Sequence, residues 1–298
     1  MKYNTIISGQ FVSRPNRFIA QVQVDGAMQT VHVKNTGRCK ELLLPGADVR
    51  LEVCDNPNRK TKYDLVAVYK PSLGWVNIDS QAPNKVVQEW LQTEGYDLVR
   101  PEYTYGGSRI DFYMEKGEEK YMLEVNGCTL EVDGIGYFPD APTLRGVKHL
   151  HELAKAAQQG YHCAVAFVIQ MEGVAEVRPN TATHPQFAEA LAQARTAGVK
   201  VLFLLCRVEP DGWPSRRQGN GKTEILQAKA HFGGPLSFIA WAGKAAPAPR
   251  CRCWQAPACQ HGPGRRCGRD TAPAPGGRCR GGRRRCRGTA RPCAGLRA

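Results

Sequence analysis

Two short apolar segments each carry one carboxylate at a position where a β-strand usually places a hydrophobic side chain. These are residues 109–114, which contain Asp111, and residues 121–125, which contain Glu124. The polar, glycine-containing residues 115–119 between them are typical of a hairpin turn. Paired strands can place the two carboxylates side by side, and two such oxygen ligands favour Mg²⁺ or Mn²⁺, the usual platform for metal-assisted phosphodiester cleavage. Alternatively, both acids face water on a half-exposed hairpin.

Further charged side chains near the hairpin are candidates for the same chemistry. Glu102 is either a third oxygen ligand from a preceding strand or an exposed acid on a sheet edge. Lys148 and Arg145 lie on a segment predicted to be helical, and either one could supply positive charge to a phosphoryl-transfer site. The alternative is a solvated helix face on which Glu152 pairs one turn further on.

The first 80 residues are expected to form the element that would hold a substrate. Alternating apolar residues predict five or six short strands and no long helix, which is typical of a small barrel of the OB type. The predicted strands are residues 5–12, 17–24, 28–33, 48–53, 64–69 and 75–78, with a tight turn at Asp25-Gly26.

The next 132 residues are predicted to form an α/β domain around the carboxylate hairpin. A helix is expected from Asn84, as its N-cap, to Glu94, and the domain boundary is placed at its start. After the hairpin the sequence predicts a strand–helix–strand order with parallel strands, because two continuous apolar runs are typical of strands buried on both faces. These later segments are a helix over 143–159, a strand over 161–170, a helix over 185–197 and a strand over 199–206.

The helix over 143–159 is predicted to be capped by Thr143. Its apolar stripe is assigned to Leu144, Val147, Leu150, Ala154 and Ala157. A second face is assigned to Arg145, Lys148, His149 and Glu152. His149 and Cys128 show no orienting partner for nucleophilic catalysis and are interpreted as packing residues.

The basic charge of the chain is concentrated at its C-terminal end. The whole sequence carries +14, but residues 245–298 hold thirteen arginines against Asp270 alone, and residues 81–212 are net acidic. No run of about 18 apolar residues spans a membrane, and residues 1–5 do not begin a signal peptide, so a cytoplasmic location is expected. An acidic centre beside a mildly basic barrel suits a metal-dependent enzyme that acts on a polyanion.

Residues 213–298 are expected to form an irregular, disordered tail. The stretch 245–298 consists mainly of Arg, Gly, Pro, Ala and Cys and has too few large apolar residues to bury a core. Two interpretations remain open. One is an arginine-rich arm that binds nucleic acid nonspecifically, and the other is out-of-frame translation of a GC-rich gene.

Basic side chains cluster around the predicted turns of the barrel. OB barrels bind single strands through basic loops together with aromatic platforms, and Phe18 and Trp75 are candidates for such platforms. Solvated loops and a core aromatic are the alternatives. The residues predicted to contact nucleic acid are Arg14, Arg17, Arg38, Arg59, Lys60 and Lys62.

Several strings of the sequence resemble the sugar fermentation stimulation protein A (SfsA) family. In the α/β region these are residues 108–112, 123–125, 128–130, 136–141 and 143–150. In the barrel region they are residues 16–18, 32–33, 35–37, 41–43 and 45–46. The resemblance covers about residues 3–212. It implies an N-terminal OB-like domain, a domain similar to the PD-(D/E)xK nucleases, and binding of nucleic acid.

By this resemblance Asp111 and Glu124 are the metal ligands, and the residue two beyond the glutamate is a catalytic lysine. Residues i and i+2 of a strand share a face, so a lysine there would project toward the same ion. This chain has Asn126 instead, which is neutral and shorter and at best holds a water. A further departure is His184-Pro185, where the family tends to have Asp-Pro.

The sequence therefore predicts an OB-like barrel over residues 1–80, a nuclease-like α/β domain over 81–212 and a tail over 213–298. The predicted function is DNA binding by a protein of the sugar fermentation stimulation type, with a domain that resembles Mg²⁺- or Mn²⁺-dependent nucleases. The candidate catalytic residues are Asp111, Glu124, Asn126 and Lys148. The alternative is a nucleic-acid-binding regulator that keeps the nuclease scaffold but does not cut, which Asn126 favours.

Overall fold

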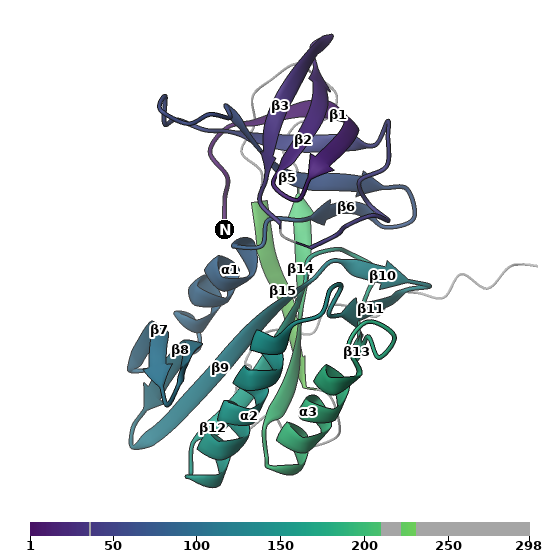
Figure 1. Cartoon of the computed structure of the whole chain (residues 1–298). Coiled ribbons are helices and arrows are strands. Elements are labelled where there is room, and N and C mark those ends of the chain that lie inside the picture. The colour runs from purple at the N-terminus through teal and green to yellow at the C-terminus, as the bar shows by residue number, and fades with distance from the viewer. Residues whose placement is uncertain (36, 210–221, 231–298) are drawn as a thin grey trace, which may run out of the picture. The chain divides into compact units, whose positions relative to one another are not determined.

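A computed structural model describes residues 1–35, 37–209 and 222–230, the last segment by its backbone alone. Residues 6–77 form a six-stranded sheet that closes on itself, because β3 pairs with β5 in parallel while the other neighbours are antiparallel (Figure 1). Its strands are β1 (Ile6–Asn16), β2 (Ile19–Val24), β3 (Ala27–Val33), β4 (Asp48–Val53), β5 (Tyr63–Lys70) and β6 (Gly74–Asn77). The predicted OB barrel is confirmed, with its hairpin turn at Asp25-Gly26.

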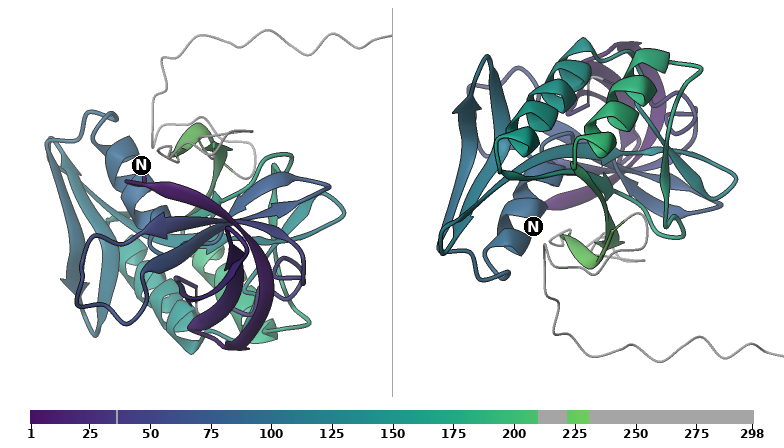
Figure 2. Two further views of the ribbon diagram at one scale, coloured as in Figure 1. Left: turned by 90° about the horizontal axis from the view of Figure 1, so that it is seen from above. Right: turned by 90° about the horizontal axis from the view of Figure 1, so that it is seen from below.

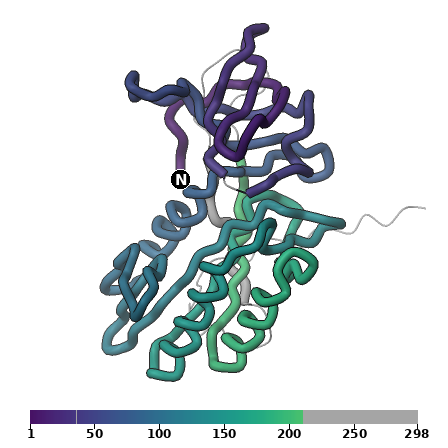
Figure 3. Tube along the Cα trace, in the orientation of Figure 1, coloured from purple at the N-terminus to yellow at the C-terminus, as the bar shows by residue number. Residues whose placement is uncertain are grey.

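The chain passes from β6 through α1 (Ala82–Leu91) into a second six-stranded sheet (Figure 3). The strand order in this sheet is β15-β14-β12-β9-β8-β7, with β9, β12 and β14 parallel. The strands are β7 (Leu98–Tyr105), β8 (Ser108–Lys116), β9 (Glu119–Cys128), β12 (His162–Ile169), β14 (Lys200–Glu209) and β15 (Lys222–Ala230). A small sheet of β10 (Leu130–Val132), β11 (Ile135–Phe138) and β13 (Val177–Pro179) lies beside it.

Helices cover both faces of the second sheet (Figure 2). Helices α2 (Leu144–Gln158) and α3 (Pro185–Thr196) pack on one face, where side chains such as Leu153 and Phe187 meet Val165 and Phe203. On the other face α1 packs Val87 and Leu91 against buried apolar side chains of the strands. The central strands are buried on both sides, which explains their continuous apolar sequence. The mixed α/β class is therefore confirmed.

Helix α1, which spans Ala82–Leu91, differs from the expected bounds at both ends, and the expected tail contains a strand. Helix α1 begins at Ala82 after the N-cap residue Gln81, because Pro83 suits the first turn of a helix. Asn84 therefore lies inside the first turn and is not the N-cap. The second error concerns the tail, which was expected to be irregular from residue 213, whereas β15 pairs antiparallel with β14. The rest of the tail prediction lies outside the described residues.

Helix α2 is predicted correctly at its start and incorrectly on one of its faces. The Thr143 hydroxyl accepts a hydrogen bond from the Gly146 N–H at 3.0 Å, so the N-cap is confirmed. Leu144, assigned to the apolar stripe, is 80% exposed. His149, assigned to a polar face, is buried next to Leu150. Among the described residues no helix is both long enough and apolar enough to cross a membrane.

Candidate functional site

The carboxylate hairpin forms as a pair of antiparallel strands, and its register brings the two acids together. The ladder ends with Phe112 of β8 opposite Leu123 of β9, and Asp111 and Glu124 are the residues that follow this last pair on the two strands. The charge of Asp111 acts on Glu124, so the two carboxylates lie close together. Side chains directly opposite each other in such a ladder share one face of the sheet. Asp111 is 8% exposed and Glu124 is 6% exposed. The alternative of two solvated acids is therefore wrong.

Asp111 is held by two hydrogen-bond donors. The Val125 N–H donates to its Oδ2 at 2.8 Å, and the Asn84 side-chain amide donates to its Oδ1 at 2.9 Å. Burial raises the pKa of Asp111, although these two hydrogen bonds act in the opposite direction. The side chain is thus fixed in orientation by one donor from its own sheet and one from α1.

Glu124 is satisfied at only one of its two oxygens. Its Oε1 faces the Nδ1 of His149, while its Oε2 is buried without a hydrogen-bond partner among the described residues. Burial raises the pKa of Glu124, and the neighbouring charge of Asp111 raises it further. A buried carboxylate oxygen without a partner is costly, because it has lost water and gained nothing in exchange. A hard cation beside Asp111 would satisfy this oxygen.

His149 is a site residue that the sequence interpretation missed. It lies four residues before Leu153 of the buried stripe of α2, so it points to the sheet. The side chain is 4% exposed, and its contact with Glu124 leaves Nε2 as the remaining ring nitrogen. The available signal was this spacing to Leu153, which places His149 on the apolar side of the helix.

The two basic side chains of α2 near the pair, Lys148 and Arg145, act differently on it. The Lys148 Nζ donates to the Gly107 carbonyl, and Lys148 forms no ion pair with either carboxylate of the site. The charge of Arg145 acts on both Asp111 and Glu124 and lowers their pKa values, though less than burial raises them. Lys148 and Arg145 line an open depression of ≈ 450 Å³ together with Arg109. This cationic depression also contains His149 in its wall.

Asn126 and Glu102, the two other candidates near the hairpin, differ in exposure and in their partners. Strand alternation puts Asn126 on the same face as Glu124, and the half-buried side chain makes no hydrogen bond to the described residues. Glu102 lies on β7, at the edge of the sheet, and pairs with Arg109 at 2.6 Å while more than half exposed. It is the exposed edge acid and not a third ligand of the pair.

The basic residues predicted to contact nucleic acid divide into engaged and exposed groups. The Arg14 guanidinium donates to four backbone carbonyls, of Arg17, Asn35, Gly37 and Arg38, so it stabilises the loops of the barrel. Arg59 makes a two-pronged ion pair with Asp64, at 2.6 and 3.0 Å. The exposed group without an ion pair to the described residues consists of Arg17, Arg38, Lys60 and Lys62.

The carboxylate pair is not part of a larger cluster of metal ligands in the described part of the chain. No group of three or more His, Cys, Asp or Glu residues there is arranged to hold a metal ion. The five cysteines in this part are free thiols, four of them buried. Two carboxylates still fit Mg²⁺ or Mn²⁺, because such ions keep several waters and bind through one or two carboxylates plus substrate phosphates.

Comparison with known proteins identifies both domains. The family model described as the SfsA N-terminal OB domain matches residues 12–78, and that described as the sugar fermentation stimulation protein RE domain matches residues 81–212. A sugar fermentation stimulation protein homolog from Desulfitobacterium hafniense is 52% identical over 215 residues, which is 71% of this chain and 93% of the relative. The homolog from Ruminiclostridium cellulolyticum is 51% identical over 213 residues, covering 70% of this chain and 94% of the relative.

A solved structure shares the fold. The structure of Pyrococcus furiosus SfsA in complex with Ca²⁺ matches with a TM-score of 0.61 and 27% sequence identity. The match covers 69% of this chain and 91% of the other. The similarity therefore extends over the barrel and the α/β domain together, and leaves the C-terminal part of this chain unmatched.

Proposed function

Since the chain belongs to the sugar fermentation stimulation protein family, we propose that it binds DNA and holds a divalent cation at Asp111 and Glu124 as a metal-dependent nuclease. The observation that carries the proposal is the buried Oε2 of Glu124, which has no partner among the described residues and lies on the face that Asp111 shares. The Ca²⁺ complex of Pyrococcus furiosus SfsA adds support from a related protein.

The residues of this chain divide the work at such a site. Asn84 and the Val125 N–H orient Asp111, and His149 holds one oxygen of Glu124 so that the other oxygen stays available. Burial of both carboxylates excludes bulk water, which strengthens electrostatic interactions inside the site. A bound Mg²⁺ or Mn²⁺ supplies Lewis-acid stabilisation of charge on a phosphodiester oxygen.

The cationic depression beside the pair gives the substrate a place to bind. Arg109, Arg145 and Lys148 line it, and a phosphate between them gains charge-assisted hydrogen bonds. In the barrel, the exposed Arg17, Arg38, Lys60 and Lys62 supply the nonspecific attraction to a polyanion that dominates DNA affinity. Binding and chemistry are thus assigned to two domains of one chain.

A second candidate function is a nucleic-acid-binding regulator that does not cut. The observation in its favour is Asn126, which occupies the position of the expected lysine and offers no positive charge. Lys148 does not replace that charge at the pair, since it is directed to the Gly107 carbonyl. In this case the cation at Asp111 and Glu124 would stabilise the protein or bind a phosphate without cleavage.

A cleavage assay separates the two candidates. Single- and double-stranded DNA and RNA are incubated with Mn²⁺ and the full chain, its Asp111→Asn variant and its Asn126→Lys variant. The nuclease proposal expects cleavage by the parent chain and a loss of at least about 100-fold in Asp111→Asn, because one metal-ligand charge is removed. Glu118→Gln is the matched control, because Glu118 is an exposed acid in the turn between β8 and β9 without an ion pair to the described residues, and its replacement should leave the rate unchanged.

Each result assigns one function. Cleavage only after Asn126→Lys supports the silent regulator. Cleavage by the parent chain that survives Asp111→Asn contradicts the metal assignment. Loss of cleavage in Glu118→Gln as well would mean that general charge, not the buried pair, controls the rate.

A further inference from the structure

The barrel contains a second cavity, none of whose lining residues belongs to the carboxylate site. Its volume is ≈ 420 Å³. Its walls come from the β1–β2 turn with Phe18, the end of β3 with His32, the β4–β5 loop with Arg59, and Gln81 before α1. In OB folds the β1–β2 and β4–β5 loops and the strand face between them bind oligonucleotides and oligosaccharides. The cavity therefore occupies the position at which this fold usually binds ligands.

Phe18 gives the cavity an exposed aromatic wall. Its side chain is 50% exposed, yet its backbone is fixed. The Asn16 side-chain oxygen accepts hydrogen bonds from the N–H groups of Phe18 and Ile19, and the Phe18 carbonyl accepts one from the Val33 N–H at 2.8 Å. The Arg17 guanidinium lies 5.8 Å from the centroid of the ring. An aromatic ring on a fixed backbone position that is left open to solvent is ready to stack on a planar partner.

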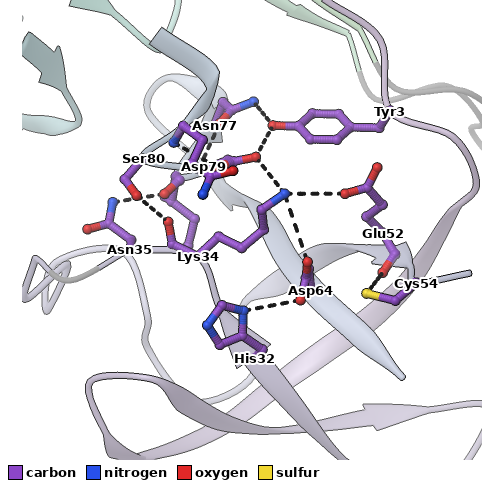
Figure 4. Close-up of polar contacts among 12 residues, drawn as sticks. Tyr3, His32, Lys34, Asn35, Glu52, Cys54, Asp64, Asn77, Asp79 and Ser80 are labelled. Atoms are coloured by element: carbon purple, nitrogen blue, oxygen red, sulfur yellow. Dashed lines mark hydrogen bonds and ion pairs between the residues drawn. The ribbon is translucent and has the colours of Figure 1, made fainter. Parts of the chain in front are cut away.

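The charged groups that line the cavity already have partners inside the protein (Figure 4). Lys34 lies 3.0 Å from Asp79, 3.4 Å from Glu52 and 3.8 Å from Asp64. Arg59 contacts Asp64 through both terminal nitrogens. No cation of the wall is left unpaired to hold a phosphate deep in this cavity, so its interior favours a neutral ligand.

Neutral hydrogen-bonding groups complete the wall. The Nδ1 of His32 is bonded to Asp64 at 3.1 Å, which leaves its Nε2 available on a side chain that is one third exposed. The Gln81 side-chain amide makes no hydrogen bond to the described residues. Asn35 is fixed by the Ile78 carbonyl and by the Gly37 N–H. An aromatic face with amide and imidazole groups at its rim is how proteins recognise unpaired bases.

From these observations we infer that the cavity binds one unpaired nucleobase of a single-stranded nucleic acid. Phe18 stacks on the face of the base, and His32 and Gln81 hydrogen-bond its edge. The inference rests on the proposed nucleic-acid function and specifies the contact that the barrel makes. Lys60 and Lys62 extend from the loop that carries Arg59 and attract the phosphates of the same strand.

Fluorescence anisotropy of a labelled single-stranded oligodeoxynucleotide tests the inference with the full chain. Phe18→Ala is expected to weaken binding by about 5- to 100-fold, which corresponds to the loss of one base–aromatic stack. Phe18→Trp should retain or improve affinity. Met28→Ala is the matched control, because Met28 is a 56% exposed apolar residue of the same barrel outside the cavity, and it should change affinity less than about twofold.

A strand that keeps its sugars and phosphates but lacks bases provides the second arm. The parent chain should bind this abasic strand more weakly than the normal strand, and Phe18→Ala should discriminate less between the two strands than the parent chain does. If the parent binds strands and Phe18→Ala changes nothing, the cavity inference is overturned and the proposed DNA binding stands. If the parent chain binds no strand, both fail. A free nucleoside and an unlabelled strand are then compared as competitors of the labelled strand. If the nucleoside displaces the labelled strand at the lower concentration, the ligand of the cavity is a small molecule.

Discussion

Two groups of buried or half-buried carboxylates in the described part of the chain differ in how their charge is balanced. In the barrel, Asp64, Asp79 and Glu52 converge on the ammonium of Lys34. Although burial opposes ionisation of Lys34, these three carboxylates raise its pKa above the ordinary value. Asp79 also accepts hydrogen bonds from the Tyr3 hydroxyl and the Gln81 N–H. Each acid of this group has a partner within the chain.

The pair in the α/β domain has no such internal cation. Asp111 and Glu124 face each other across the β8–β9 ladder, and burial raises the pKa of both. His149 and the donors to Asp111 satisfy three of the four carboxylate oxygens, and Glu124 Oε2 stays without a partner among the described residues. The contrast indicates that the barrel group stabilises the fold, whereas the pair is kept incomplete for a ligand.

Replacing Lys34 should have the largest effect on stability. Lys34→Met keeps much of the side-chain volume but leaves the fully buried Asp79 without its cation, and removing one partner of a buried ion pair costs about 3–5 kcal/mol. The measurement is chemical denaturation at neutral pH. Lys62→Met, a change at an exposed lysine of the same domain, should stay within about 0.5 kcal/mol. A loss below about 1 kcal/mol in Lys34→Met would mean that the barrel carboxylates do not depend on this ammonium.

For the pair Asp111 and Glu124, we expect the stability of the protein to depend on a bound cation. Mn²⁺ or Ca²⁺ at about 100 times its Kd should stabilise the parent chain by about 2.7 kcal/mol, because the ion binds the folded state alone. Glu124→Gln should abolish this stabilisation, and Glu118→Gln, a change at an exposed acid of the β8–β9 turn, should preserve it. Without the ion, Glu124→Gln should not be strongly destabilising, since it removes a buried charge next to Asp111. Full cation stabilisation in Glu124→Gln would show that the ion binds elsewhere.

The elements of both domains could be predicted from sequence because their signals are local. Period-two alternation indicates the barrel strands, and the acids of Asp111 and Glu124 stand out in otherwise apolar strands. The convergence on Lys34 could not be predicted, because its partners come from β4, β5 and the segment after β6 and meet only when the barrel closes. The lack of a partner for Glu124 Oε2 could likewise not be predicted, because it depends on tertiary packing.

Two site residues were misassigned for identifiable reasons. Asn84 was interpreted as an N-cap because asparagine favours that position. Pro83 in the first turn places the N-cap three residues earlier, at Gln81, and frees the Asn84 amide to reach Asp111. His149 was assigned to the face of α2 that carries Arg145 and Lys148, although its spacing to Leu153 places it on the buried side of the helix. Its partner Glu124 comes from the sheet beneath the helix and could not be predicted from the helix alone.

Lowering the pH tests the role of Asp64 in the carboxylate group of the barrel. Burial alone would raise the pKa of Asp64, but the hydrogen bonds and charges of Arg59, with Lys34 and His32, bring it below the ordinary value. A depressed pKa means that Asp64 stabilises the folded state above the pKa of the unfolded chain and loses this effect as the pH falls. Asp64→Asn should therefore lower stability by about 2 kcal/mol at pH 7.

Thermal or denaturant unfolding of both proteins across pH values measures this difference. The gap between the parent chain and Asp64→Asn should narrow as the pH drops below the ordinary carboxylate value of 3.8 and toward the lower pKa of the folded state. Asp55→Asn is the control, since Asp55 is an exposed acid of the β4–β5 loop. A gap that is the same at all pH values would show that packing, not charge, accounts for the effect of Asp64.

The smallest expected effect concerns the helix that carries His149 to Glu124. Thr143→Ala removes the hydroxyl that accepts from the Gly146 N–H and should cost about 1 kcal/mol of stability. Because the substitution leaves both carboxylates and His149 unchanged, stabilisation by Mn²⁺ should persist in full, as differential unfolding with and without the ion would measure. If Mn²⁺ stabilisation falls together with the cap, then the position of His149 is itself a determinant of ion binding. In that case ion binding at Glu124 Oε2 requires the correct position of α2, just as the ion pairs of Lys34 require closure of the barrel.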